Sequence, residues 1–173
     1  MERKEIILKK IIEKYVIYIA FVAVLLLGIL IRMSFRRFVS GDAQLYLIPW
    51  YEEIKNNGGL NGLGIQVGNY NLLYQFFIAI FTYLPINALY SYKIFSIIFD
   101  IALALMGALW VKNIWKADIW KIFLAFTLIF ISPIVILNSS LWAQCDSIYC
   151  YFCILTLYLL FQRKYWRAMI VYC

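Results

Sequence analysis

The sequence predicts an all-α membrane protein, a polytopic bundle of transmembrane helices with a long outer first loop that carries amphipathic helices. Hydrophobic residues make up 65% of the chain and charged residues 14%, whereas soluble domains have about 45–50% and about 25%. The apolar residues fall into long runs whose ends carry tryptophan and tyrosine, as at the two interfaces of a bilayer. We therefore treat residues 1–173 as one membrane domain.

The charged residues, the cysteines and the lack of histidine limit the partners and the chemistry that we expect of this chain. The net charge of +7 indicates topology first, because lysine and arginine gather on the cytoplasmic side of membrane proteins. We therefore expect membrane lipid and no nucleic acid as a partner. The chain has no histidine, so acid–base chemistry falls to Asp, Glu, Tyr, Lys or Cys. Cys150 and Cys153 lie one helical turn apart in an apolar run, which favours small core residues over metal ligands.

Each predicted span follows from an apolar run. Residues 1–14 are charged and amphipathic and predict an interfacial helix on the cytoplasmic side that leads into a first span at 15–31. Three later runs, 94–111, 122–137 and 147–162, predict further spans, about four in all. The chain ends soon after the start of another apolar run, so we expect it to be the N-terminal part of a larger protein.

The apolar stretch 70–84 is ambiguous, because it is shorter than the roughly 20 residues that a span needs and Pro85 closes it. It either crosses the membrane or lies in its surface. If it does not cross, the basic clusters at 112–121 and 163–167 both lie in the cytoplasm, as the positive-inside rule favours. The two ends that carry Asp42 and Asp146 then face the same non-cytoplasmic side.

The outer loop, residues 33–69, has structure of its own. Leu47, Trp50, Tyr51 and Ile54 fall on one face of a helix. This spacing predicts an amphipathic helix over 43–55 that lies in the outer interface of the membrane.

Two acids follow apolar runs and are the main candidate site residues. Asp42 lies in the polar stretch 40–44, and two roles are open for it: a helix N-cap, or a functional carboxylate kept at the mouth of a membrane segment. Asp146 could also be a cap, but it closes a patch, residues 138–146, that is more polar than a plain turn needs. Trp142 and Gln144 lie in the same patch.

The other charged residues in apolar surroundings have separate readings. Asp100 lies inside an apolar run, so we expect it to face the bundle interior with a partner, as a structural contact; Lys93 is two turns away and too far to be that partner. Arg32, Arg36 and Arg37 lie on the outer side, against the charge rule. They either reach toward lipid phosphates or bind the phosphate of a substrate.

Several short motifs resemble the GT-C superfamily of polytopic glycosyltransferases. They are Ser-Gly-Asp at 40–42, Trp-Tyr at 50–51, Gly-Asn-Tyr at 68–70, the run 93–100 that ends in Asp, and Ser-Pro through Trp-Ala-Gln-Cys-Asp-Ser at 132–147. The chain looks closest to bacterial relatives of the mannosyltransferase that adds the second mannose in glycosylphosphatidylinositol synthesis. It is also similar in layout to the lipid-linked-oligosaccharide glucosyltransferases. Where relatives carry Trp-Gly-Gln-x-Asp, this chain has Ala143.

The resemblance implies inverting transfer of a sugar from a polyprenyl-phosphate donor to a glycan or lipid acceptor, on the outer face of a bacterial plasma membrane. It implies that Asp42 is the general base. Asp146 and Gln144, with Trp142 near them, would position sugar or acceptor, and Arg36 or Arg37 would bind the leaving phosphate. No cofactor is expected, although a divalent metal remains possible. A transporter or flippase of lipid-linked saccharides and a non-catalytic membrane subunit are the alternatives.

Overall fold

The computed structural model describes residues 3–173, which form helices and connecting turns with no strand in this part of the chain. Helix α1 (Arg3–Ser34) is 32 residues long, so it extends about 48 Å at 1.5 Å per residue. The predicted lead and first span therefore form one continuous helix from Arg3 onward. In the apolar part of α1, only 17% of the residues are buried.

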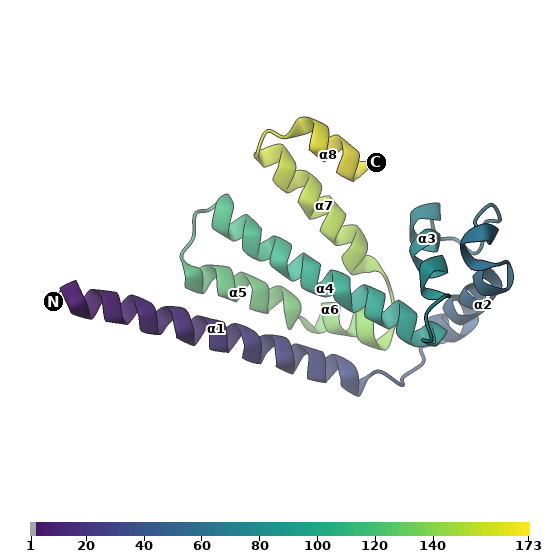
Figure 1. Cartoon of the computed structure of the whole chain (residues 1–173), viewed down its shortest axis with the longest axis horizontal. Helices are drawn as coiled ribbons and strands as arrows, with labels where there is room; N and C mark the ends of the chain where they lie inside the picture. The colour runs from purple at the N-terminus through teal and green to yellow at the C-terminus, as the bar shows by residue number, and fades with distance from the viewer. Residues whose placement is uncertain (1–2) are drawn as a thin grey trace.

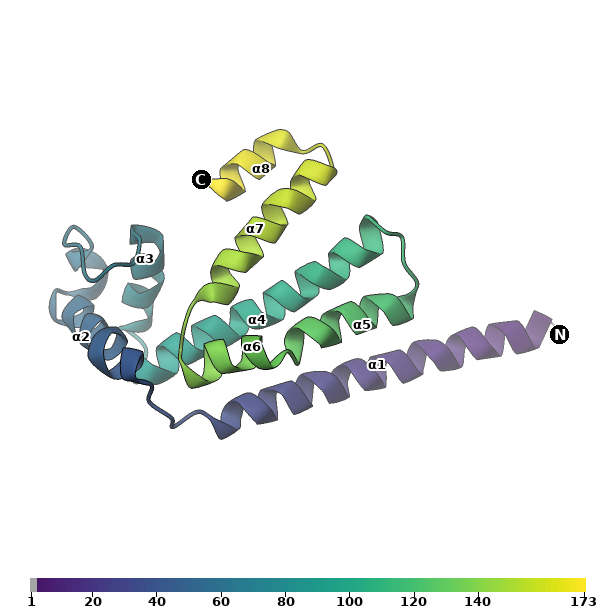
Figure 2. The same ribbon diagram turned by 180° about the vertical axis from the view of Figure 1, so that it is seen from behind.

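Three helices lie side by side and form the centre of the bundle (Figures 1 and 2). Helix α4 (Ala88–Asn113) runs antiparallel to α1, and α5 (Ile119–Phe130) returns beside both. Their shared core contains two alanines of α4 and two phenylalanines of α5: Ala104, Ala108, Phe126 and Phe130. Small residues on one helix opposite rings on the other let the helices approach closely.

The predicted span 122–137 is not one straight helix. After α5 the chain bends by 45° at a break before the short α6 (Pro133–Ile136), which continues into a π-helical turn, Leu137–Leu141. The break falls at Pro133, because proline has no N–H to donate to the preceding turn and its ring crowds that turn. Helix α7 (Asp146–Phe161) then packs on α4, and α8 (Tyr165–Tyr172) folds back on α7.

The predicted outer loop forms a compact cap at one end of the bundle. A π-helical turn (Ala43–Leu47) leads into α2 (Ile48–Asn56), a 3₁₀ turn (Gly59–Gly62) and α3 (Leu72–Phe81). The predicted apolar face of α2 is present, but it packs into the protein core rather than toward a lipid interface. The Tyr51 hydroxyl, for example, donates to the carbonyls of Phe81 and Ile86, both at 3.2 Å.

Two helices are long and apolar enough to cross a membrane, α1 over Tyr15–Ser34 and α4 over Ala88–Asn113. A third is possible if the bent pair of α5 and α6 counts as one span. The expected four spans are therefore only partly matched. Helix α7 has 16 residues, and α3, which corresponds to the ambiguous stretch 70–84, has ten.

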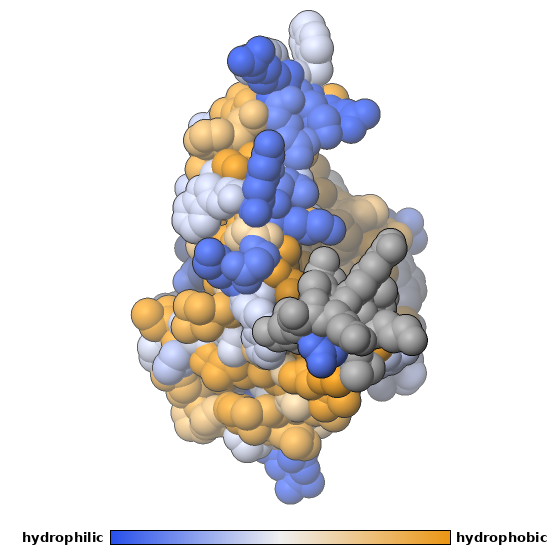
Figure 3. Space-filling model, turned by 90° about the vertical axis from the view of Figure 1, so that its left-hand side faces the viewer, coloured by the Kyte–Doolittle hydropathy of each residue, from blue (hydrophilic) through white to orange (hydrophobic). Residues whose placement is uncertain are grey.

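The two ends of the bundle differ in charge. The turn between α4 and α5 and the turn between α7 and α8 lie toward the end from which α1 starts (Figure 1). Six exposed basic residues lie in these turns or at the helix ends beside them: Lys112, Lys116, Lys121, Arg163, Lys164 and Arg167. Figure 3 looks at this end and shows a band of hydrophilic residues bordered by hydrophobic surface. The cap formed by α2 and α3 occupies the opposite end.

Candidate functional site

Asp42 and Gln144 meet at the cap end of the bundle. Asp42 directly precedes the first π-helical turn, and Gln144 lies in the loop between the second π-helical turn and α7. The Gln144 amide Nε2 donates to Asp42 Oδ2 at 3.1 Å, across 102 residues of sequence. The Asp42 side chain is exposed and makes no capping hydrogen bond, so the alternative role as an N-cap is not what the structure shows.

Ser40 takes the capping role instead. Its hydroxyl oxygen accepts from the backbone N–H of Ala43 at 3.1 Å, and the same hydroxyl donates to the Trp142 carbonyl at 3.1 Å. One buried side chain thus shapes the Asp42 turn and joins it to the loop that carries Gln144. The Trp142 ring itself is exposed, 49% accessible, so only its backbone takes part in this junction.

Tyr70 is a site residue that the sequence did not single out. Its hydroxyl donates to Gln144 Oε1 at 3.3 Å, which produces a hydrogen-bonded chain from Tyr70 through Gln144 to Asp42. Burial raises the pKa of Tyr70 well above its usual value, with further contributions from Cys145 and from the carboxylates of Asp146 and Asp42. The phenol therefore stays protonated and remains a hydrogen-bond donor.

Asp146 lies in the first turn of α7 and is exposed. Its Oδ2 accepts from Asn138 Nδ2 at 2.7 Å, and Asn138 Oδ1 is buried with no partner among residues 3–173. Asp146 makes no hydrogen bond to Asp42 in this part of the chain, so the two acids share the site through the loop rather than through direct contact.

The loop backbone explains how Gln144 is presented. Trp142 N–H donates to the Leu137 carbonyl and Gln144 N–H to the Asn138 carbonyl, which closes the chain back on the π-helical turn. Ala143 adopts φ 60°, a left-handed conformation that costs an alanine about 1–2 kcal/mol. Glycine adopts it freely, which fits the glycine that the resembling motif carries at this position.

The two predicted phosphate ligands lie on the connector between α1 and Asp42. Arg36 and Arg37 are both exposed. Arg36 Nη1 donates to the Met33 carbonyl at 3.1 Å. Within residues 3–173, neither guanidinium forms a hydrogen bond or ion pair with Asp42, Gln144 or Asp146, so their role stays a prediction.

An apolar groove begins beside this site. It lies between α3, α4, α7 and α8 and has a volume of about 450 Å³. Tyr70 and Cys145 line its polar end, and aromatic rings such as Phe77 and Phe99 line the rest. Tyr74 also lines it, and the hydroxyl of this residue is buried without a hydrogen-bond partner in the described part of the chain. The groove can therefore take a hydrophobic chain and offers it a polar group near the site.

No group of three His, Cys, Asp or Glu side chains among residues 3–173 is arranged to hold a metal ion. In comparisons with known proteins, no family model, curated protein or solved structure matches this chain. The resemblance to membrane glycosyltransferases therefore depends on the residues quoted above.

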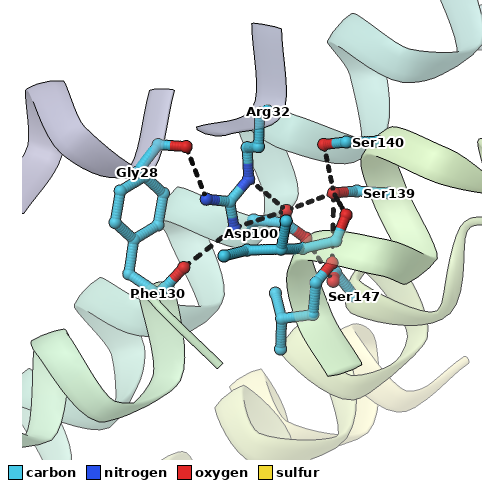
Figure 4. Close-up of polar contacts among 9 residues, drawn as sticks. Gly28, Arg32, Asp100, Phe130, Ser139, Ser140 and Ser147 are labelled. Atoms are coloured by element: carbon cyan, nitrogen blue, oxygen red, sulfur yellow. Dashed lines mark hydrogen bonds and ion pairs between the residues drawn. The ribbon is translucent and has the colours of Figure 1, made fainter. Parts of the chain in front are cut away.

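The partner of Asp100 is Arg32, which the sequence indicated only as a lipid or phosphate contact. Arg32 Nε and Nη2 lie 3.0 and 2.9 Å from Asp100 Oδ2, and both side chains are buried (Figure 4). The remaining guanidinium N–H groups donate to the carbonyls of Gly28 at 3.1 Å and Phe130 at 2.9 Å. The expectation of a buried, partnered Asp100 is confirmed, whereas the outward role for Arg32 is wrong.

Lys93 has a different role on the same helix. Its ammonium group donates to the carbonyls of Phe35 at 2.8 Å and Phe38 at 2.7 Å. Both carbonyls lie just beyond the end of α1, where helical partners run out. The Phe35 carbonyl also accepts from the Phe38 N–H at 3.0 Å, and Lys93 adds a charged donor to each carbonyl. The sequence did signal that Asp100 and Lys93 have partners, because charged residues inside apolar runs require them. It did not identify Arg32 or the Phe35 and Phe38 carbonyls as those partners.

Proposed function

We propose that this chain is a membrane glycosyltransferase that transfers a sugar from a polyprenyl-phosphate donor to a glycan or lipid acceptor, with Asp42 as the general base. The observation that carries the proposal is the hydrogen bond between Gln144 and Asp42. It joins two of the motifs that carry the family resemblance, the one at 40–42 and the one at 132–147, although they lie far apart in the sequence. The proposal places the site on the outer face of a bacterial plasma membrane and the start of α1 in the cytoplasm.

The reaction assigns one proton transfer to Asp42. The acceptor hydroxyl attacks the anomeric carbon while its proton passes to the Asp42 carboxylate. The bond between that carbon and the lipid phosphate oxygen breaks, and the lipid phosphate leaves. Gln144 holds Oδ2 of Asp42, which leaves Oδ1 for the acceptor. A positioned base of this kind contributes about 10²–10⁴-fold to a rate.

The apolar groove supports a donor that carries a lipid. Its aromatic lining suits a polyprenyl chain, and its polar end at Tyr70 and Cys145 adjoins Gln144. In this arrangement the sugar lies over Asp42 and Asp146 while the chain follows α3 and α7. Arg36 and Arg37 are close enough in sequence to Asp42 to reach the leaving phosphate, and an arginine fork suits that group.

The test uses the full chain in proteoliposomes with radiolabelled mannosyl and glucosyl polyprenyl phosphates and a panel of glycan acceptors. Asp42→Asn should lower transfer by about 10²–10⁴-fold, because the amide cannot accept the proton. Glu52→Gln is the matched control, since Glu52 is an exposed acid on α2 at the same end of the bundle, and it should retain activity. Transfer by Asp42→Asn at the wild-type rate would refute the assignment.

One observation favours a transporter as the second candidate. The break between α5 and α6 makes a discontinuous helix, and such helices line substrate sites in many transporters. A transporter would move a labelled lipid-linked saccharide across the vesicle membrane without any transfer of its sugar. That result from the same proteoliposomes would favour this candidate over the glycosyltransferase.

A further inference from the structure

The Asp100 carboxylate lies at the centre of a buried cluster of polar side chains in the described structure. It is fully buried and accepts from Arg32 and from the hydroxyls of Ser139 at 2.6 Å and Ser147 at 2.5 Å (Figure 4). Ser147 bonds to Oδ1, whereas Arg32 and Ser139 bond to Oδ2. Because both oxygens are occupied and no solvent reaches them, Asp100 can act on the site only through its partners.

Each partner belongs to a segment that leads into or out of the candidate site. Arg32 lies in the last turn of α1, shortly before Asp42. Ser139 lies in the π-helical turn before the Gln144 loop, and Ser147 follows Asp146 in the first turn of α7. One carboxylate on α4 therefore joins the segment before Asp42 to both flanks of the loop that carries Gln144 and Asp146.

Lys93 holds the same connector from the same helix. By binding the Phe35 and Phe38 carbonyls it fixes the chain between Arg32 and Asp42 on α4. Ser140, next to Ser139, adds a hydroxyl contact of 3.2 Å within the buried cluster. Helix α4 thus holds both the connector before Asp42 and the segments that flank the Gln144 loop.

We infer that Asp100 is a positioning residue of the candidate site: its carboxylate sets the distance between Asp42 and the Gln144 loop. The inference rests on the proposed function only in that it concerns the same site. Without Asp100, Ser139 and Ser147 lose their shared acceptor and the loop is freed from α1. The contact between Gln144 and Asp42 then opens, while the apolar helix core remains.

Native Cys145 is a reporter for this inference, because it is partly buried in the loop beside Gln144 and burial raises the pKa of its thiol. The full chain carries Cys150→Ser, Cys153→Ser and Cys173→Ser, so that Cys145 is its one remaining cysteine. The rate at which Cys145 is alkylated is then measured in nanodiscs at pH 8. Asp100→Asn should raise that rate by about tenfold or more through local opening. Ser96→Ala is the matched control, because its buried hydroxyl on the same helix has no partner among residues 3–173, and it should leave the rate unchanged.

A second reporter separates positioning from general loosening. A chain that retains only Cys153, which lies on α7 beyond the loop, should react equally fast with and without Asp100→Asn. The double variant Ser139→Ala/Ser147→Ala, which keeps the ion pair between Arg32 and Asp100, should also expose Cys145 selectively. The inference is overturned if the Cys145 rate stays at the wild-type value in both variants, or if Cys145 and Cys153 accelerate together.

Activity assays make this failure distinguishable from failure of the proposed function. If Asp100 sets the geometry around Asp42, Asp100→Asn lowers kcat more than it raises KM, and Asp100→Glu restores part of the rate. If Asp100→Asn exposes Cys145 selectively but the wild-type chain transfers no sugar, the positioning role is supported and the enzyme proposal is rejected. Loss of transfer by Asp42→Asn with no Cys145 response to either variant supports the enzyme and rejects the positioning role.

Discussion

Gln144 is the residue on which the candidate site depends most directly. Its amide accepts from Tyr70 with the oxygen and donates to Asp42 with the nitrogen. An ionised carboxylate in its place could do only the first, since it has no proton to donate. The amide therefore links a neutral phenol to a carboxylate and fixes the orientation of both.

The first residue-scale prediction concerns Tyr70→Phe, which removes the hydroxyl that orients Gln144. A hydrogen bond of this kind contributes about 0.5–1.5 kcal/mol, so transfer should fall by up to about tenfold. Because burial raises the pKa of Tyr70, the phenol stays protonated and the ratio of wild-type to variant rates should be constant from pH 7 to about pH 10. Rate profiles against pH check this.

Tyr46→Phe is the control, because that ring is half exposed on the neighbouring π-helical turn and its hydroxyl makes no hydrogen bond in the described structure. A ratio that falls toward one as the pH approaches 10 would mean that Tyr70 ionises normally and that the contact with Gln144 does not shield it.

The sequence predicted the acids and the polar patch of the site but not the chain of bonds between them. Asp42 and Asp146 stand out because carboxylates next to apolar runs are costly. Tyr70 does not stand out, since tyrosine is common at membrane interfaces. The position of Arg32 at the end of an apolar run is unusual, but its pairing with Asp100 was not predictable. The two residues are 68 positions apart, and their contact depends on the position of α1 relative to α4 along the helix axes.

At the scale of elements, two π-helical turns frame the site: one directly follows Asp42, and the other contains Asn138 and precedes Gln144. A π-helical turn is wider than an α-helical one and is often found at functional positions. Hydrophobic spacing predicted ordinary helices over 43–55 and 122–137, because a single wide turn barely alters the period. This local geometry was therefore not predictable from the pattern.

The element-scale prediction concerns the packing of α1 on α5. A Cβ at Gly28 would collide with the ring of Phe130, which is fully buried. Gly28→Ala should therefore lower the free energy of unfolding by about 1–3 kcal/mol, as overpacked cores do. Denaturant unfolding in detergent measures it. Gly64→Ala, where an added Cβ meets nothing within 4 Å, should change stability far less, and equal effects of the two variants would contradict the close packing.

At the scale of the whole molecule, the candidate site and the basic turns lie at opposite ends of the bundle (Figure 1). Composition predicted a membrane class, and in the described residues two helices, or three if the bent pair counts as one span, are long and apolar enough to cross a bilayer. The number of spans was harder to predict. Pro133 breaks one expected span, and α7, with 16 residues, is shorter than the roughly 20 residues that a bilayer requires.

The molecular-scale prediction is a topology map. Single cysteines introduced by Lys116→Cys and Lys164→Cys in a cysteine-free chain should react with an impermeant maleimide from one side of oriented vesicles. Gln44→Cys should react from the other side, because we expect the membrane to be crossed once, by α4, between Gln44 and Lys116. Labelling of all three from the same side would contradict a spanning bundle.

The same map decides the position of α3. Its ten residues extend about 15 Å, half of the roughly 30 Å hydrocarbon layer. Asn61→Cys and Pro85→Cys flank this helix at exposed positions and should both react from the Gln44 side. Labelling of these two flanks from opposite sides would instead mean that the helix crosses.

The ion pair between Arg32 and Asp100 also bears on how the chain is made. A lone aspartate costs about 2.5–3.5 kcal/mol at the centre of an inserting helix. Ser139 and Ser147 are synthesised 39 and 47 residues after Asp100, so they cannot offset that cost when α4 emerges from the ribosome. Arg32 is already available. We therefore expect Arg32 to be the first partner of Asp100 during membrane insertion, and the hydrogen bonds from Ser139 and Ser147 to form last.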